Sequence, residues 1–278
     1  MPVVLNTDDF SALQGIAQWL KHKTGIYYPE SKLETLKHKL FKVCLDNRLT
    51  LSQLCAQLHN GDGQKSPLSL QVVAAASTNY TAFFREDIWD WFSTEILVDV
   101  MLRTQQIRIW SAAASSGEEA YTIAMVAAEV MGIEQLRQRV AILGTDISFQ
   151  ILRQAEDAIY PVERLLNIPT PYRQKYFSSC NGNRAHCAVI HEALRSVCLF
   201  RRMNLKKHPY PFKKRFHIIF CRNVLYYFAP LEREKIVNAL YNFTEKNGWL
   251  IVSVTESLTN MNTKWKKIKG KTGIYRKE

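Results

Sequence analysis

The sequence predicts an α/β protein with a Rossmann-like core, a small all-helical N-terminal domain and an inserted antiparallel β-subdomain. Three observations predict this fold. Residues 1–70 carry their apolar side chains at helical spacing. Residues 107–121 form a strand, a turn and a helix, and a second strand follows at 140–147. Between residues 159 and 199, prolines and a hairpin signal interrupt this rhythm of strands and helices.

Length and composition set the first limits on function. The 278 residues are 47% hydrophobic and 22% charged, as expected of a globular chain with a sizeable core. No run of about 18 apolar residues and no export signal is present, so we expect a cytoplasmic protein without membrane insertion. The six cysteines form no Cys-x-x-Cys pair, and we expect no metal site. The net charge of +12 favours an anionic partner, whether nucleic acid, a membrane surface or an acidic protein.

The N-terminal domain, placed at residues 1–70, is expected to contain three helices. Asp8 or Asp9 can cap the first, and the next two cover residues 33–44 and 50–58. The second helix carries several lysines, which form either a docking surface or an ordinary solvated face.

The second domain, placed at residues 71–278, begins with a helix near 68–76 that connects the two parts. Ser77, Thr78 and Asn79 are typical caps for the helix expected from Ile88 to Met101. Arg85 follows two phenylalanines. A guanidinium held against aromatic rings can bind a carboxylate through two hydrogen bonds. The alternative is that Arg85 forms a structural ion pair.

The turn after the first strand is acidic and rich in small residues. Ser111 to Ser116 and Gly117 leave the backbone accessible, and Glu118 and Glu119 follow where the helix begins. Neither Gly-x-x-x-x-Gly-Lys nor Gly-x-Gly-x-x-Gly is present, which argues against a phosphate-binding loop. The turn therefore suits a cofactor with a ribose and a cation, such as S-adenosylmethionine. The alternative is that small residues only let the helix pack closely on its strand.

Further candidate residues follow the later strands. Asp146 ends the second strand, where an acid can accept both ribose hydroxyls, or it can cap the helix from Phe149. Asn204 follows the strand at 197–200 and can bind an adenine edge. Asn223 and Tyr227 follow the buried strand at 216–220 and would face the cofactor and the reacting group.

The remaining segments complete the core and its insertion. Residues 160–198 are expected to form the inserted antiparallel sheet, whose role is substrate or partner recognition or that of a lid. A helix at 231–246, a strand at 249–254 and a closing hairpin at 265–276 are expected after it.

Five motifs occur in an order that resembles the chemotaxis receptor methyltransferase family, the CheR type. They are Thr78-Asn-Tyr-Thr-Ala-Phe-Phe-Arg-Glu86, Trp110-Ser-Ala-Ala-Ala-Ser-Ser-Gly-Glu-Glu119, Gly144-Thr-Asp-Ile147, Asn204-Leu205 and Phe220-Cys-Arg-Asn-Val-Leu-Tyr-Tyr-Phe228. The resemblance implies a Rossmann-like S-adenosylmethionine-dependent methyltransferase that modifies glutamate side chains on the cytoplasmic helices of methyl-accepting chemoreceptors and leaves S-adenosylhomocysteine as product. It also implies a monomer that does not act on nucleic acid.

The resemblance further assigns roles to residues. The residues that would line the cofactor site are Asn79, Thr81, Arg85, Glu119, Asp146, Asn204, Leu205, Asn223 and Val224. Arg85 and Tyr227 would stand nearest the transferred methyl group and act in catalysis. Tyr226 is a second tyrosine that could share the role of Tyr227. The insertion carries Asn181-Gly-Asn183 without the glycine-rich loop of members that bind a receptor's C-terminal peptide, so tethering of that kind is not expected.

Two alternatives belong to other classes. A nucleic-acid methyltransferase would suit the basic run from Arg201 to Arg215, but the Asn-Pro-Pro-Tyr type of base-flipping motif is missing. A non-catalytic binding protein could keep the cofactor fold as a scaffold, but the candidate site residues are intact. The sequence does not distinguish flagellar chemotaxis from another chemosensory pathway.

Overall fold

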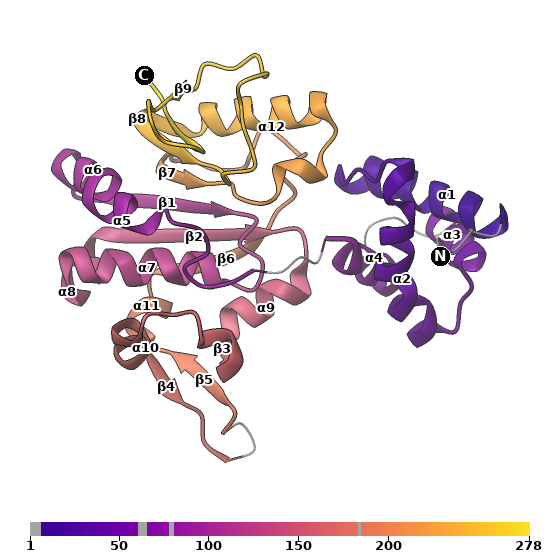
Figure 1. Cartoon of the computed structure of the whole chain (residues 1–278), viewed down its shortest axis with the longest axis horizontal. Coiled ribbons are helices and arrows are strands. Elements are labelled where there is room, and N and C mark those ends of the chain that lie inside the picture. The colour runs from indigo at the N-terminus through magenta and orange to yellow at the C-terminus, as the bar shows by residue number, and fades with distance from the viewer. Residues whose placement is uncertain (1–6, 61–65, 78–80, 183–184) are drawn as a thin grey trace. The chain divides into compact units, whose positions relative to one another are not determined.

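The computed structural model describes residues 7–60, 66–77, 81–182 and 185–278. The chain forms two compact units. The first contains residues 1–79 together with 226–233, and the second contains residues 80–225 together with 234–278. Figure 1 labels the helices and strands of both units.

The first unit is helical. Its helices are α1 (Thr7–Thr24), the short 3-10 helix η1 (Glu30–Lys32), α2 (Leu33–Asn47), α3 (Leu51–Asn60) and α4 (Pro67–Ser77). The apolar positions that predicted the first three α-helices, including Leu13, Leu36 and Leu54, are buried. Residues 226–233 join this unit through an antiparallel bridge between Ile26 and Phe228. The helical period of the sequence therefore predicted these helices correctly.

A seven-stranded sheet forms the centre of the second unit. Its strands lie in the order β6 (Cys198–Arg202), β2 (Val140–Asp146), β1 (Ile107–Ala112), β7 (Phe216–Phe220), β8 (Thr244–Ile251), β10 (Ile274–Arg276) and β9 (Lys266–Lys267). The first five strands are parallel, and β10 and β9 form the closing antiparallel hairpin. All five residues of β7 are buried, which explains why four of them are apolar, with His217 as the exception. This doubly wound arrangement confirms the predicted α/β fold class.

Helices cover the sheet. They are α5 (Trp89–Trp91), a π-helical turn η3 (Phe92–Ile96), α6 (Leu97–Arg103), α7 (Glu118–Met131), α8 (Ile133–Arg139), α9 (Phe149–Asp157) and α12 (Pro230–Asn242). Figure 1 shows α7 and α12 on opposite sides of the strands. Most of α7 is buried, because it packs between the sheet and the insertion.

The predicted capping of the helix before β1 by Ser77 is wrong, whereas the start of that helix agrees with the predicted Ile88 to within one residue. The helix begins at Trp89 without a side-chain cap, and it changes to π geometry at Phe92. The Ser77 hydroxyl instead donates to the carbonyl of Val73 within α4, while Thr78 and Asn79 lie outside the described residues. Ser77 therefore belongs to the end of α4, because a serine hydroxyl can donate to a backbone carbonyl one turn earlier as well as cap the N-terminus of a helix.

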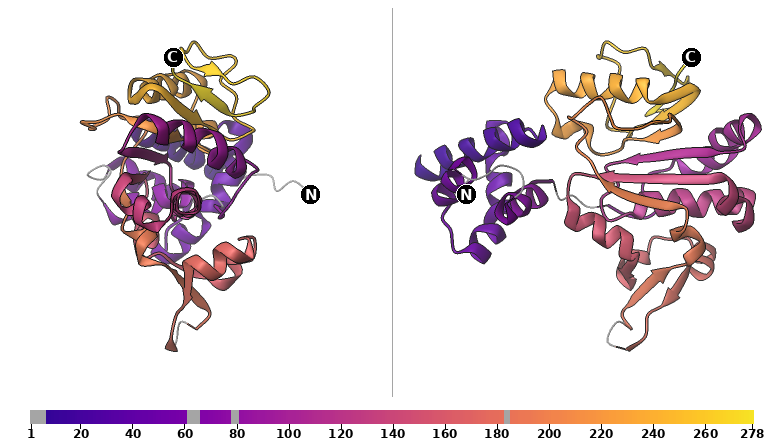
Figure 2. Two further views of the ribbon diagram at one scale, coloured as in Figure 1. Left: turned by 90° about the vertical axis from the view of Figure 1, so that its left-hand side faces the viewer. Right: turned by 180° about the vertical axis from the view of Figure 1, so that it is seen from behind.

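The insertion after α9 forms a separate antiparallel sheet, as predicted. Its strands β3 (Ile159–Pro161), β5 (Cys187–Ile190) and β4 (Phe177–Ser179) lie in that order, with η4 (Val162–Leu165), α10 (Thr170–Tyr176) and α11 (Glu192–Arg195) beside them. Figure 2 shows this small sheet below the larger one in the view from behind. The Tyr176 hydroxyl donates to Glu129 of α7 at 2.6 Å, which attaches the insertion to the core.

The boundary between α12 and β8 also differs from the prediction. The helix was expected to continue to residue 246, but it ends at Asn242, and β8 begins at Thr244. A β-bulge lies between Thr244 and Trp249, where Asn247 has a φ of 61°. Asn247 and Gly248 therefore belong to an irregular strand.

Within the described parts of the chain, no helix is both long and apolar enough to span a membrane.

Candidate functional site

The turn between β1 and α7 is held against the end of β2. The backbone N–H groups of Ala113 and Ala114 both donate to the carbonyl of Thr145 at 2.8 Å. Ala113, Ser115 and Gly117 have positive φ values. A Cβ atom at Gly117 would lie 2.9 Å from the Ala155 side chain, so glycine is required there for space as well as for conformation. The turn predicted from small residues is therefore a fixed, strained connection.

Glu119, in the first turn of α7, points back toward the end of β1. Its carboxylate accepts hydrogen bonds from the Ser111 hydroxyl at 2.7 Å and from Arg222 at 3.2 Å. The side chain is 14% exposed. Burial raises the pKa of Glu119, although Arg222 and Ser111 lower it in part. A carboxylate has about four lone-pair sites, so Glu119 keeps capacity to accept from a ligand hydroxyl.

Arg222, which sequence reasoning did not select, connects several candidate residues. Its guanidinium lies 3.2 Å from Glu119, 3.1 Å from Glu86 and 2.6 Å from the backbone carbonyl of Arg85, to which it donates. Only 3% of the Arg222 side chain is exposed. The one sequence signal was a charged residue two positions after the mostly apolar strand 216–220.

The backbone around Arg85 is constrained on both sides. Phe84 and Glu86 have φ values of 52° and 66°, so Arg85 lies between two left-handed residues. Glu86 accepts from the Ser253 hydroxyl at 2.8 Å. Burial by itself would raise the pKa of Glu86, but Arg222 and Ser253 hold it below its ordinary value. The Arg85 backbone is thus fixed against the same guanidinium that binds Glu119.

Asp146 ends β2 and accepts two backbone hydrogen bonds. Ser115 N–H and Ser148 N–H each donate to its carboxylate at 3.0 Å. Burial raises the pKa of Asp146, against the effect of these hydrogen bonds. The cap of α9 is Ser148, whose hydroxyl accepts from Ile151 N–H. Asp146 is therefore not the cap of that helix, which removes the structural alternative considered for it.

Asn204 and Leu205 follow β6 beside Asp146. The carbonyl of Asp146 accepts from Met203 N–H at 2.8 Å, which places the start of this loop at the end of β2. The Asn204 side-chain oxygen accepts from Lys206 N–H at 2.9 Å, and Leu205 is buried. The structure therefore brings these two candidate segments to one edge of the sheet.

Asn223 and Val224 lie at the end of β7 in a turn organised by Glu256. The Glu256 carboxylate accepts from the N–H groups of Asn223 and Leu225, both at 2.8 Å. Asn223 has a φ of 57°, and both Asn223 and Val224 are partly exposed. Glu256 lies far along the sequence, in the segment after β8, and sequence reasoning missed it.

The remaining candidate residues lie elsewhere. Thr81 is a partly exposed residue at the start of the second unit, and Asn79 lies outside the described residues. Tyr227 belongs to the first compact unit, where its backbone carbonyl accepts from Tyr27 N–H at 2.6 Å. The second unit by itself therefore brings together Arg85, Glu119, Asp146, Asn204 and Asn223 along the carboxyl ends of its strands.

These groups fit a cofactor with ribose hydroxyls and a positive charge. Two partly exposed carboxylates, Glu119 and Asp146, stand at the ends of adjacent strands, and each has a pKa raised by burial. Such groups accept hydrogen bonds and stabilise a nearby cation, whereas they would repel a phosphate. Among the described side chains, no group of three or more His, Cys, Asp or Glu residues is arranged to hold a metal ion.

Comparison with known proteins agrees with this chemistry. Residues 79–274 match the family model described as "CheR methyltransferase, SAM binding domain". A chemotaxis protein methyltransferase of Vibrio anguillarum is 31% identical over 94% of both chains. The protein of the same description from Borreliella burgdorferi is 35% identical over 68% of both chains, and that of Escherichia coli is 29% identical over 90% of this chain and 85% of its own. The chain is therefore a member of the CheR family of S-adenosylmethionine-dependent methyltransferases.

Proposed function

We propose that this protein transfers a methyl group from S-adenosylmethionine to glutamate side-chain carboxylates of chemoreceptors, and so sets receptor adaptation in chemotaxis or a related chemosensory pathway. The relatives in Vibrio and Escherichia coli are described as chemotaxis protein methyltransferases. The structural observation that best supports the proposal is the Arg222 guanidinium, which binds the carboxylate of Glu119 and the backbone of Arg85 together.

The cofactor-binding residues are proposed to be those that the resemblance assigned. Glu119 and Asp146 accept hydrogen bonds from the ribose, and the other residues that line the site are Asn79, Thr81, Arg85, Asn204, Leu205, Asn223 and Val224. The bound cofactor supplies a methyl group attached to a positively charged sulfonium. The two carboxylates favour that charge and take no part in the bond changes.

The reaction itself needs no general base. A glutamate with an ordinary pKa of about 4.3 is ionised at neutral pH, so its oxygen is already nucleophilic. A carbon–oxygen bond forms as the carbon–sulfur bond breaks, and no proton is taken up or released. The chain must therefore hold the substrate carboxylate in line with the methyl group. We assign this task to the Arg85 guanidinium and to Tyr227, with Tyr226 as the neighbouring residue to test.

The substrate is proposed to be the acidic cytoplasmic helices of a chemoreceptor. A net charge of +12 suits an acidic protein partner, and a glutamate-rich helix supplies both the charge and the reacting groups. We propose that the protein acts as a cytoplasmic monomer and not on nucleic acid.

The test is transfer of labelled methyl groups to membranes that contain the host's chemoreceptors. The expected result is label on receptors that mild base releases as methanol, because carboxyl methyl esters are base-labile. Arg85→Ala should lower the rate at least about 100-fold, since a misplaced reactant costs about that much. Arg137→Ala, which removes an exposed arginine of α8, is the matched control and should retain the rate.

Tyr227→Phe and Tyr226→Phe are compared in the same assay to assign the tyrosine. Cofactor binding without receptor labelling would contradict the proposal. Label recovered on nucleic acid would instead support the second class of methyltransferase that the basic run at 201–215 suggested.

A further inference from the structure

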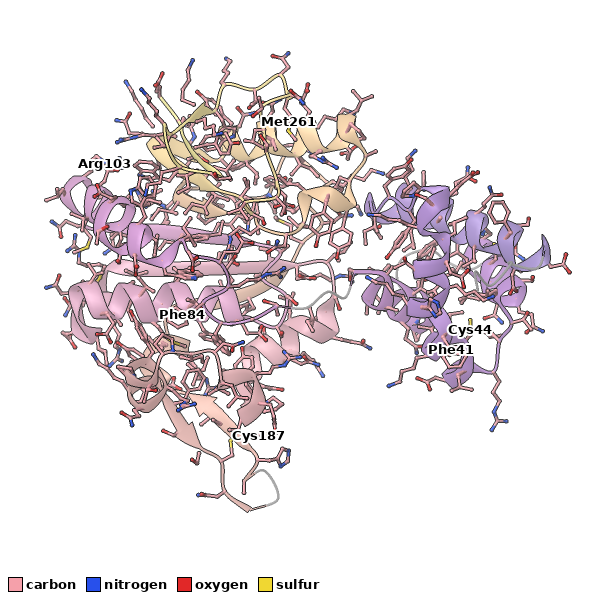
Figure 3. All side chains as sticks on the ribbon, in the orientation of Figure 1. Phe41, Cys44, Phe84, Arg103, Cys187 and Met261 are labelled. Atoms are coloured by element: carbon pink, nitrogen blue, oxygen red, sulfur yellow. The ribbon has the colours of Figure 1, made fainter. Side chains whose placement is uncertain are left out.

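The hairpin of the insertion carries two cysteines that face each other across its strands. Ser179 of β4 pairs with Ala188 of β5, so the next pair toward the turn is Cys180 and Cys187. The Cys180 N–H donates to the Cys187 carbonyl at 3.0 Å, which continues the ladder by one residue. Figure 3 shows Cys187 near the end of the hairpin. Both thiols are free and partly exposed.

This pairing places the two cysteines opposite each other in the ladder. Directly opposite residues of a hydrogen-bonded antiparallel pair have Cα atoms about 5.5 Å apart, with both side chains on the same face of the sheet. Disulfides span Cα distances of about 4.4–6.8 Å. A disulfide also needs Cβ atoms about 3.5–4.5 Å apart, whereas opposite strand residues have Cβ atoms about 4.5–5.5 Å apart, so a small local adjustment of the backbone accompanies bond formation.

The other four cysteines are less suited to oxidation. Cys44 and Cys55 lie on separate helices of the first unit, and Cys198 and Cys221 lie at β6 and directly after β7. Burial raises the pKa of each of these four thiols, which disfavours the reactive thiolate.

We propose that Cys180 and Cys187 form a reversible disulfide when the protein meets a peroxide, and that this bond closes the hairpin turn of the insertion. One thiol reduces hydrogen peroxide, which gives a sulfenic acid and one water. The second thiol then attacks the sulfenic sulfur, and the disulfide forms as a second water leaves. A dithiol reductant restores both thiols. The proposal concerns a modification of the chain and does not depend on the methyl acceptor.

The consequence for the insertion is a covalently closed loop. Gly182 has a φ of 64°, the Ala185 N–H donates to its carbonyl at 3.1 Å, and the two flanking strands β4 and β5 are antiparallel. A disulfide removes conformations that open this turn and separate β4 from β5. The oxidised insertion would therefore present one fixed surface to whatever it contacts.

Peptide mapping of the full chain tests the proposal. Trypsin cleaves after Lys175, Arg184 and Arg195, which puts the two cysteines into separate peptides, 176–184 and 185–195. The purified protein is treated with hydrogen peroxide, alkylated and digested without reductant. The expected product is the two peptides linked, with the mass of their sum less two hydrogens, and dithiothreitol should separate them.

Matched variants complete the test. Cys180→Ser and Cys187→Ser should each abolish the linked product, while Cys44→Ser should retain it. Titration of the six thiols should show a loss of two per chain in the wild type. The proposal is overturned if peroxide converts Cys180 or Cys187 to sulfinic or sulfonic acid, or links them to a second chain, while the 176–184 and 185–195 peptides stay separate.

Discussion

Arg222 and Glu119 form an ion pair of 3.2 Å at the carboxyl ends of β7 and β1. The arginine side chain is 3% exposed and also contacts Glu86 and the backbone of Arg85. The two terminal nitrogens of Arg222 contact two carboxylates and a carbonyl, while its buried Nε has no hydrogen-bond partner among the described residues. The pair therefore fixes the positions of two candidate site segments that are distant in sequence.

Replacement of this arginine should be strongly destabilising. Arg222→Met leaves Glu119 and Glu86 without their shared cation, and loss of one partner of a buried ion pair costs about 3–5 kcal/mol. Urea denaturation should show that loss in the free energy of unfolding. Arg276→Met is the control, because Arg276 pairs with Asp99 at 3.2 Å but is 33% exposed, and it should cost about 1 kcal/mol or less. Equal losses in the two variants would contradict a special role for Arg222.

Glu119→Gln should weaken cofactor binding. The amide keeps the shape but removes the charge, and a hydrogen bond to a charged group contributes about 1.5–3 kcal/mol, which corresponds to roughly a 10- to 100-fold change in affinity. Calorimetric titration with S-adenosylmethionine measures it. Glu129→Gln, on the same helix and paired with Lys175 at 2.9 Å, should bind as the wild type does. Unchanged affinity in Glu119→Gln would remove Glu119 from the cofactor site.

Arg164→Ala should loosen the attachment of the insertion to α7. Arg164 of η4 donates to Glu118 at 2.7 Å, and the Glu118 side chain is fully buried at the helix start. Without Arg164, the buried Glu118 carboxylate keeps the Ser116 hydroxyl at 2.7 Å but has no cation, so we expect a loss of about 2–4 kcal/mol in the free energy of unfolding. Arg195→Ala breaks an exposed pair with Glu192 and should cost less than about 1 kcal/mol. A small loss in Arg164→Ala would show that solvent replaces the arginine.

His217 should make the protein less stable in weak acid. Its Nδ1 accepts from the Arg108 N–H at 3.0 Å, and burial together with the Arg108 charge lowers its pKa from 6.5 to about 4. Since the folded pKa lies below the unfolded value, the stabilisation is complete above pH 6.5 and is lost as the pH falls toward 4.

The measurement for His217 is the free energy of unfolding between pH 4 and 7. We expect a decrease on the order of 2 kcal/mol over this range in the wild type. His217→Gln cannot titrate and should show a flatter profile over the same range. His191→Gln, which changes a histidine of the insertion, is the control and should keep the wild-type slope. A slope that persists in His217→Gln would assign the effect to other groups.

Much of the architecture could be predicted from the sequence alone. Helical spacing at Leu13 and Leu36 marked the N-terminal helices, because a helix with one buried face repeats its apolar residues at that spacing. The mostly apolar stretch Phe216–Phe220 marked a buried strand, because both of its faces are covered. The sequence made Glu119, Asp146 and Asn223 candidates because they lie at the end of a predicted strand or shortly after one. In a parallel sheet these strand ends share one edge, so position along the chain already places them together.

The tertiary structure decided what those residues contact. The site is organised by ion pairs and hydrogen bonds that Arg222, Glu86 and Glu256 make with residues distant in sequence. A local sequence pattern does not predict such partners. The pairing of Arg164 with Glu118 likewise depends on how the insertion folds back on α7. The π turn at Phe92 and the bulge in β8 replaced a regular helix and a later strand start, because packing against the sheet outweighed local preference. The spacing of apolar residues and the succession of helices and strands along the chain are local properties, and the sequence determined them. The charge network is a long-range property that exists only once the sheet has assembled.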